Sequence, residues 1–264
     1  MSTPLAPTDE KNDPPAYTIL NETTETSLLF LCDHASNTIP ASLQQLGLSK
    51  QHINAHIAWD IGAACVTKKL SQRFNATAIL SGYSRLVIDC NRQPGDPHSI
   101  PAVSDAIPVP ANQNLSDEEV DQRADNYFFP YHDATNRLIS HIWRHGRAPI
   151  LIGIHSFTPK MNNIARPWHL GVLWNHDDRL ALPLLDELNK NEALCIGENE
   201  PYSGRQIGYT MTNHGEAAGL AHVVLEIRQD LIATEQGCED MAALIYKALL
   251  PILANPALHI VEHF

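Results

Sequence analysis

Two histidines stand where short apolar runs of the sequence give way to polar residues. His34 follows the run LLFLC and Asp33, and His155 directly follows the run ILIGI. Each run is typical of a buried strand, which would hold an imidazole ring in place. Imidazole is a common zinc ligand, and catalytic zinc sites combine three protein ligands with a water molecule. A histidine at a strand end can also be an ordinary hydrogen-bonded side chain, and with 14 histidines in the chain some reach such positions by chance.

The third ligand of such a site must come from another part of the sequence, because the chain has no H-E-x-x-H motif and no cysteine cluster. The candidates are Asp60 in HIAWDIGA, Asn37 three residues after His34, and Asp33 beside it. A carboxylate binds zinc much better than a neutral amide does, which favours Asp60. Asp60 could instead be the N-cap of the helix that we expect over residues 60–74.

Two arginines could bind or polarise a substrate. Arg85 and Arg92 flank the run LVIDC, and Asn91 comes directly before Arg92. A guanidinium can clamp a carboxylate through two hydrogen bonds or polarise a carbonyl group. Either arginine could equally form a structural ion pair with one of the 30 acidic residues.

A carboxylate inside an apolar strand is a candidate general base. Glu226 lies in the run VVLEI, and burial there would raise its pKa towards a value that suits proton transfer. Its alternatives are an ion pair with Arg228 or an edge position that faces solvent.

The apolar patterns predict the elements that would bring these residues together. Ser116 begins a capping box, and Pro130 should kink the helix that follows. Alternating strands and helices predict an α/β fold: a single domain over residues 17–264, after a disordered arm over residues 1–16, with a mixed, mostly parallel sheet and helices on both faces. Ligands bind at the carboxyl ends of strands in such sheets, so the polar strand ends should converge on one crevice. We expect strands over residues 28–32, 77–80, 86–90, 150–154, 170–174 and 222–227, and helices over 60–74, 116–142, 180–188 and 240–253.

Charge and composition exclude several classes of partner. The net charge of −12 argues against nucleic acid and anionic membrane, and an anionic substrate would need a local basic pocket. The five cysteines form no C-x-x-C pair, and the polar, proline-rich start lacks the features of a signal peptide. No apolar run is long enough to span a bilayer. We therefore expect a cytoplasmic protein that acts on a small molecule, with its oligomeric state left open.

At these residues the sequence resembles the N-formylglutamate amidohydrolase family. The matching segments run in the family's order from about residue 28 to 232: DHASNTIP, the WD of HIAWDIGA, SRLVIDCNRQPGDP, PYHDATNRL, GIHSFTP, GRQIGYTMTNHG and HVVLEIRQDLI. The most specific are SRLVIDCNR and GIHSFTP. The resemblance implies a zinc-carboxypeptidase-like (phosphorylase/hydrolase-like) fold and zinc-dependent hydrolysis of the amide of an N-formyl or N-acyl amino acid, such as N-formylglutamate to formate and glutamate.

Carried over by this resemblance, His34 and His155 become zinc ligands and Asp60 becomes the candidate third ligand. In the carboxypeptidase-like relatives, the position three residues after the first histidine holds a ligand glutamate, and here it holds Asn37. Family members that act on formylglutamate tend to show a His-Ala/Ser-Gly turn where this chain has His-Ala-Ser-Asn. We therefore interpret the chain as a divergent branch, for which the reaction class transfers better than the substrate.

The resemblance also assigns the mechanism. Arg85 resembles the arginine that polarises the scissile carbonyl, Asn91 and Arg92 resemble the pair that holds a substrate carboxylate, and Glu226 resembles the catalytic glutamate. Zinc would activate a water molecule, and Glu226 would take its proton and return it to the leaving amine. One alternative is a non-catalytic small-molecule binding or sensor protein, which would have lost zinc. Another is a metal-free cysteine or serine hydrolase, whose activity would survive chelation.

Overall fold

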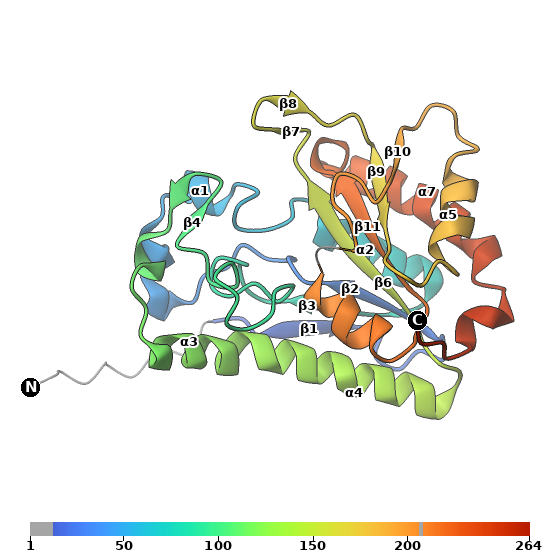
Figure 1. Ribbon diagram of the computed structural model, residues 1–264, viewed down its shortest axis with the longest axis horizontal. Helices are drawn as coiled ribbons and strands as arrows, with labels where there is room; N and C mark the ends of the chain where they lie inside the picture. The colour runs from blue at the N-terminus through green and yellow to red at the C-terminus, as the bar shows by residue number, and fades with distance from the viewer. Residues whose placement is uncertain (1–12, 206–207) are drawn as a thin grey trace, which may run out of the picture.

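The computed structural model describes residues 13–205 and 208–264, and one seven-stranded sheet organises them (Figure 1). The strands lie in the order β1-β3-β2-β6-β11-β9-β10. Neighbours from β3 to β11 run parallel, whereas β1 is antiparallel to β3 and β9 is antiparallel to β11. The sheet is therefore mixed and mostly parallel, as predicted. Its strands are β1 (Tyr17–Leu20), β2 (Leu28–Cys32), β3 (Thr77–Ser81), β6 (Ile150–Phe157), β9 (Leu170–Leu173), β10 (Ile196–Glu198) and β11 (His222–Arg228).

Helices cover both faces of this sheet, which confirms the predicted α/β architecture. The helices α2 (Ala63–Phe74), α5 (Ala181–Leu188) and α7 (Glu235–Ile252) share one apolar core with the sheet. The long helix α4 (Phe129–His145) packs on the opposite face and runs beneath the sheet in Figure 1. Apolar residues of α4 recur at Leu138 and Ile142, four positions apart, so that they lie on one side of the helix and become buried.

The helical segment after Ser116 differs from the single kinked helix that we predicted. Ser116 forms the expected capping box with Glu119 and starts α3 (Asp117–Arg123). A π-helical turn over 124–128 then separates α3 from α4, and Pro130 lies in the first turn of α4. Proline is tolerated there because the first helical residues need no N–H donor. The regular α-helix is therefore interrupted at residues 124–128, before Pro130, and not at Pro130 itself.

Residues 86–90 do not form the strand that we predicted. They run as turns, and Leu86, Val87 and Ile88 are buried in a separate apolar cluster beside the sheet. Buried backbone groups must find hydrogen-bond partners, and here side chains supply them. The Asn112 amide donates to the Leu86 carbonyl, and Arg123 donates to the Val87 carbonyl. An apolar run can thus be buried without joining the sheet.

The remaining elements are short. They are α1 (Lys50–Ile53), α6 (Tyr209–Met211), the β4–β5 hairpin (Val103–Ser104, Ile107–Pro108) and the β7–β8 hairpin (Lys160–Met161, Ile164–Ala165). The sequence patterns did not indicate these elements, nor the edge strands β1 and β10. Most of the expected N-terminal arm, residues 1–12, lies outside the described residues. Within the described ranges, no helix has the length and apolar character that a bilayer crossing requires.

Candidate metal centre

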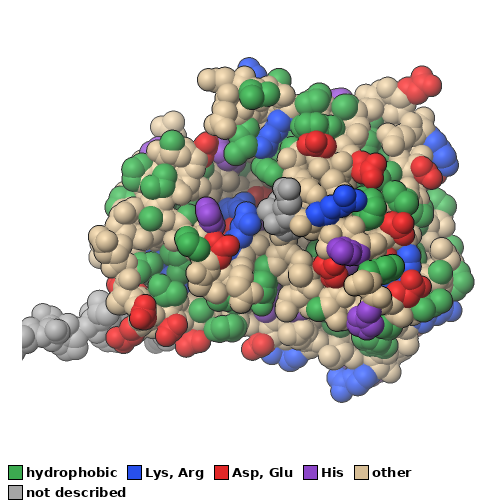
Figure 2. All heavy atoms as spheres, viewed as in Figure 1, with side chains coloured by type: hydrophobic (Ala, Val, Ile, Leu, Met, Phe, Trp, Pro, Cys, Tyr) green, Lys and Arg blue, Asp and Glu red, His purple; other side chains and the backbone are tan. Residues whose placement is uncertain are grey.

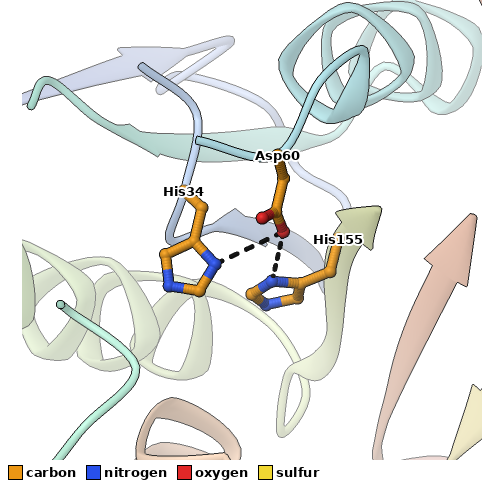
Figure 3. Close-up of side chains that lie close together, drawn as sticks. All are labelled: His34, Asp60 and His155. Carbon is orange, nitrogen blue, oxygen red and sulfur yellow. Dashed lines mark hydrogen bonds and ion pairs between the residues drawn. The ribbon is translucent and has the colours of Figure 1, made fainter. Parts of the chain in front are cut away.

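Three segments that are distant in the sequence bring His34, Asp60 and His155 together (Figure 3). His34 stands two residues after β2, Asp60 precedes α2, and His155 lies inside β6, which continues to Phe157 instead of stopping at His155 as we expected. The Nδ1 atoms of His34 and His155 lie 3.3 Å and 2.9 Å from Oδ2 of Asp60. One ligand atom from each of the three residues lies within 4.8 Å of the others, and all three residues are buried. The group could hold a metal ion.

The turn before α2 directs the Asp60 carboxylate towards the histidines. Asp60 is not the N-cap of α2, because Gly62 holds that position. Gly62 has a φ of +84°, and a Cβ there would lie 2.4 Å from the Ile232 carbonyl oxygen, so only glycine fits this turn. The Ser156 amide also donates to Asp60 Oδ2, at 3.2 Å. The Asp60 carboxylate is therefore fixed both by the turn before α2 and by the Ser156 amide.

Asn37, a second candidate for the third ligand, does not join this group. Its side-chain amide donates to the Ile53 carbonyl at 3.2 Å and to Asn54 Oδ1 at 3.0 Å. Of the three candidates, only Asp60 lies beside Nδ1 of both histidines, because Asn37 bonds elsewhere and Asp33 faces Nε2 of His155.

Each histidine also faces a second carboxylate through its other ring nitrogen. His34 Nε2 lies 2.7 Å from Asp89 Oδ1, and His155 Nε2 lies 3.1 Å from Asp33 Oδ2. Metal-binding histidines almost always donate the other ring N–H to such a group, which fixes the tautomer and orients the ring. Because Nε2 is occupied in this way, Nδ1 of both rings is left to bind a cation beside Asp60. The donor set and its supporting carboxylates fit zinc.

The pKa shifts of the buried carboxylates and of His155 also fit a bound cation. Burial opposes ionisation of Asp60 and Asp89, but the neighbouring His34 lowers the pKa of Asp60, and Arg85 lowers the pKa of Asp89. Burial also disfavours the charged form of His155, yet hydrogen bonds to Asp33 and Asp60 raise its pKa well above the usual value. A positive charge on His155 would thus help to neutralise the carboxylates. A divalent cation would replace that charge, since metal binding requires neutral imidazoles.

Arg85 contacts the metal group through Asp60 and also lines a cavity beside it. It donates to Asp89 Oδ2 from Nε at 3.0 Å and from Nη2 at 2.6 Å, and its Nη1 lies 3.6 Å from Asp60 Oδ1. These are the ion pairs that we considered as its structural role. Its side chain nevertheless remains 28% exposed and lines the pocket. Arg85 can therefore support the site and also present a positive charge to a ligand.

Glu226 lies on β11 directly beside His155 in the parallel register. It is 6% exposed, and its Oε2 atom has no hydrogen-bond partner among the described residues. Arg228 pairs with Asp230 instead of Glu226, and β11 is an interior strand, so neither alternative for Glu226 is realised. Burial raises the pKa of Glu226 to about 7. A buried carboxyl with a free oxygen atom and a pKa near neutrality is suited to accept and return a proton.

A cavity of about 400 Å³ reaches the metal group at Asp60. Asp60, Arg85, Asp89 and Arg92 line it together with residues of the β7–β8 hairpin. In Figure 2 the surface is hollowed beneath this hairpin, and basic and histidine side chains gather around the hollow. Asn91 is not among the residues that line this cavity. Its Oδ1 accepts from the Thr210 backbone amide, and its own backbone amide donates to Asp89 Oδ1. Of the predicted Asn91–Arg92 pair, Arg92 lines this cavity, and a substrate-binding role for either residue stays a prediction.

Sequence reasoning missed the residues that support the histidines. We considered Asp33 only as a ligand, and we did not single out Asp89 because it lay in the predicted strand LVIDC. Asp33 Oδ1 accepts hydrogen bonds from the Tyr131 hydroxyl at 2.8 Å and the Thr210 hydroxyl at 3.0 Å. An aspartate inside an apolar run was the available signal, because burying a lone carboxylate is costly.

The geometry does not favour a serine or cysteine nucleophile. The Ser156 hydroxyl donates to the Ile61 carbonyl at 2.9 Å, and no histidine is among its described hydrogen-bond partners. Burial raises the pKa values of the Cys32 and Cys90 thiols, which keeps both sulfurs protonated and unreactive.

Comparison with known proteins identifies a matching family and solved structures with a similar fold. The family model described as N-formylglutamate amidohydrolase matches residues 26–233. The fold is similar to a gene product of Agrobacterium tumefaciens, with a TM-score of 0.87 and 35% identity over 92% of this chain and 98% of that one. It is also similar to N-formylglutamate amidohydrolase from Ralstonia eutropha JMP134, with a TM-score of 0.69 and 18% identity over 90% of this chain and 97% of that one. A search of curated proteins found no match.

Proposed function

Because the chain belongs to the N-formylglutamate amidohydrolase family and is an amidohydrolase, we propose that it hydrolyses N-formyl or N-acyl amino acids such as N-formylglutamate with zinc as its cofactor. His34, Asp60 and His155 would hold the zinc ion. The observation that carries the proposal is the position of Glu226, which is buried, lacks a partner at Oε2 and lies beside His155. A buried carboxyl with one unpartnered oxygen beside a proposed zinc ligand is suited to proton transfer, which a protein that only bound or sensed its ligand would not need.

When bound, zinc would supply Lewis acidity, which lowers the pKa of water and polarises a carbonyl group. The chain's own residues would handle the proton and the charge. Glu226, as the carboxylate, accepts a proton from the attacking water and delivers it to the nitrogen of the leaving amine. Arg85 presents its guanidinium to the cavity, where it offsets the negative charge that develops on the amide oxygen. The water oxygen ends in the released acid, and the amine leaves with the proton.

Arg92 would bind the carboxylate of the amino-acid part. It lines the cavity and forms no ion pair with the described residues, whereas Arg85 is held by two aspartates. The protein's net charge of −12 repels anions in general, so binding of an anionic substrate depends on such local cations.

The test is metal analysis of the purified protein together with a screen of N-formyl and N-acetyl amino acids. We expect stoichiometric zinc, release of the free amino acid, loss of activity on chelation and recovery when zinc is added back. Full activity in protein shown to be metal-free would overturn the proposed zinc dependence. Zinc-loaded protein that hydrolyses no compound of the series would overturn the proposed substrate class.

A further inference from the structure

Two buried histidines outside the metal group are joined by a direct hydrogen bond. Nδ1 of His132, on α4, lies 2.8 Å from Nε2 of His214, in the π-helical turn over 212–216, and the two rings stack. The residues are only 4% and 2% exposed. Within residues 13–205 and 208–264, no other two histidines share a hydrogen bond. They belong to PYHDATNRL and GRQIGYTMTNHG, yet neither has a place in the metal group or in the proposed proton transfer.

The direction of this hydrogen bond follows from the other partner of His132. Its Nε2 lies 2.8 Å from the Cys90 carbonyl oxygen, which only accepts. Burial lowers the pKa of His132 and lowers that of His214 to about 4, so both rings are neutral near pH 7 and each carries one N–H. His132 therefore donates from Nε2 to Cys90 and accepts at Nδ1 from His214, which fixes this tautomer. Neutral His214 must then accept at Nδ1, so the Asn136 amide, whose Oδ1 lies 3.0 Å away, would have to turn its nitrogen towards it.

The Cys90 carbonyl belongs to the turn that carries two residues of the site. Asp89 Oδ1 lies 2.7 Å from Nε2 of His34, and Arg92 lines the cavity. Residues 88–92 form neither a strand nor a helix, so no regular ladder of backbone hydrogen bonds holds them. Bonds to neighbouring segments must therefore fix the turn.

His132 is the main partner of that carbonyl. Cys90 is buried, and the other contact of its oxygen within the described ranges comes from the Thr210 hydroxyl at 3.4 Å. That hydroxyl has one hydrogen and lies closer to Asp33 Oδ1, at 3.0 Å. Loss of the His132 donor would therefore leave a buried carbonyl unsatisfied, which costs more than the hydrogen bond itself contributes. The turn would have to move to recover a partner.

We propose that His132 is a positioning residue of the site and that His214 acts through it. By holding the Cys90 carbonyl, the pair keeps Asp89 against the metal group and Arg92 in the cavity. This inference rests on the proposed function, which gives the turn its importance. Neither histidine lines the cavity or belongs to the metal group, so both act only through the turn.

The main experiment compares His132→Gln with His132→Met in the full-length protein, without and with zinc. The two new side chains have nearly the same length and volume, but only glutamine keeps an N–H that can reach the Cys90 carbonyl. Hydrogen exchange is measured by NMR at the amides of Asn91 and Arg92, which close the turn onto Asp89. His132→Met should speed exchange about 10-fold or more, because the buried carbonyl loses its donor, whereas His132→Gln should change it less than about threefold.

Zinc affinity should separate the same variants. In competition with a chromophoric chelator, His132→Met should lose about 10-fold, the lower end of what the loss of a carboxylate behind a metal-binding histidine costs, and His132→Gln should not. At the second position, His214→Gln can still donate to His132 and should stay near native, whereas His214→Met should behave like His132→Met. The matched control, His259→Met, removes another 2.8 Å bond to a backbone carbonyl, that of Ala148 at the opposite end of β6 from His155, and should change neither reading.

Equal exchange rates and equal zinc affinities in the glutamine and methionine variants would show that the pair only fills the core, and would overturn the inference. The wild type gives an independent reading, which decides if His132→Met does not fold: a long-range ¹H–¹⁵N spectrum that places the His132 proton on Nδ1 would overturn it too. A wild type that binds no zinc or hydrolyses no N-formyl amino acid would count against the proposed function. The exchange comparison would still decide whether the pair holds the turn.

Discussion

Replacing Asp33 with asparagine tests whether the outer carboxylates prepare the histidines for a metal. In Asp33→Asn, the hydroxyls of Tyr131 and Thr210 would still donate to one side-chain position, at 2.8 Å and 3.0 Å in the native protein, and so would hold the amide oxygen there. The amide nitrogen would then face His155 Nε2, which now lies 3.1 Å from Asp33 Oδ2. Because two donors cannot hydrogen-bond to each other, His155 would carry its proton on Nδ1.

That change of tautomer removes the ring atom that faces Asp60. Loss of a carboxylate behind a metal-binding histidine typically costs 10- to 100-fold in metal affinity, or about 1.4 to 2.8 kcal/mol. We expect this loss in Asp33→Asn, measured by competition for zinc with a chromophoric chelator at fixed pH. The control is Thr210→Val, which removes one hydrogen bond to Asp33 and leaves its contact with His155, and should change zinc affinity less than about threefold. A folded Asp33→Asn protein with native zinc affinity would refute the reasoning.

Three further changes test the other parts of the site. His155→Ala should abolish stoichiometric zinc in a folded protein, as measured by elemental analysis, and retained zinc would remove His155 from the ligand set. Glu226→Gln should lower kcat about 10²- to 10⁴-fold with zinc content unchanged, because glutamine cannot accept the proton; near-native turnover would refute its role. Since burial raises the pKa of Glu226 to about 7 and only the carboxylate accepts a proton, wild-type kcat/KM should rise with pH through that region, and a profile already flat below pH 6 would contradict this. Arg92→Met should raise KM for N-formyl amino acids far more than for the matching neutral amides, and an equal rise for both would make Arg92 structural.

The sequence was most informative where burial alone decides structure. Continuous apolar runs predicted the interior strands β2, β3 and β6, and the capping residue Ser116 predicted where α3 begins. The run LVIDC misled us, because an apolar run is also buried when it packs as turns in a side cluster. The difference depends on Asn112 and Arg123, which donate to the Leu86 and Val87 carbonyls from 26 and 36 residues further along the chain. No local sequence pattern shows these hydrogen bonds. The edge strands β1 and β10 have partly exposed, irregular sequences and so escaped notice.

The candidate site shows the same limit. His34, His155 and Glu226 could be chosen from their local sequence, because each interrupts or ends an apolar run. Residue type favoured Asp60 over Asn37, but the position of the Asp60 carboxylate depends on the turn at Gly62, which residue spacing does not show.

The order in which the metal residues occur along the chain has a consequence for biosynthesis. His34 and Asp60 leave the ribosome early, but the strand that carries His155 pairs with β2 across more than a hundred residues. Glu226 arrives later still, on a strand that inserts between β6 and β9. Such distant pairings form slowly, because a long loop must close before they can stabilise the chain. A nascent chain therefore cannot assemble the centre until β6 has been made and has paired with β2, and a metal ion would have to bind after that point.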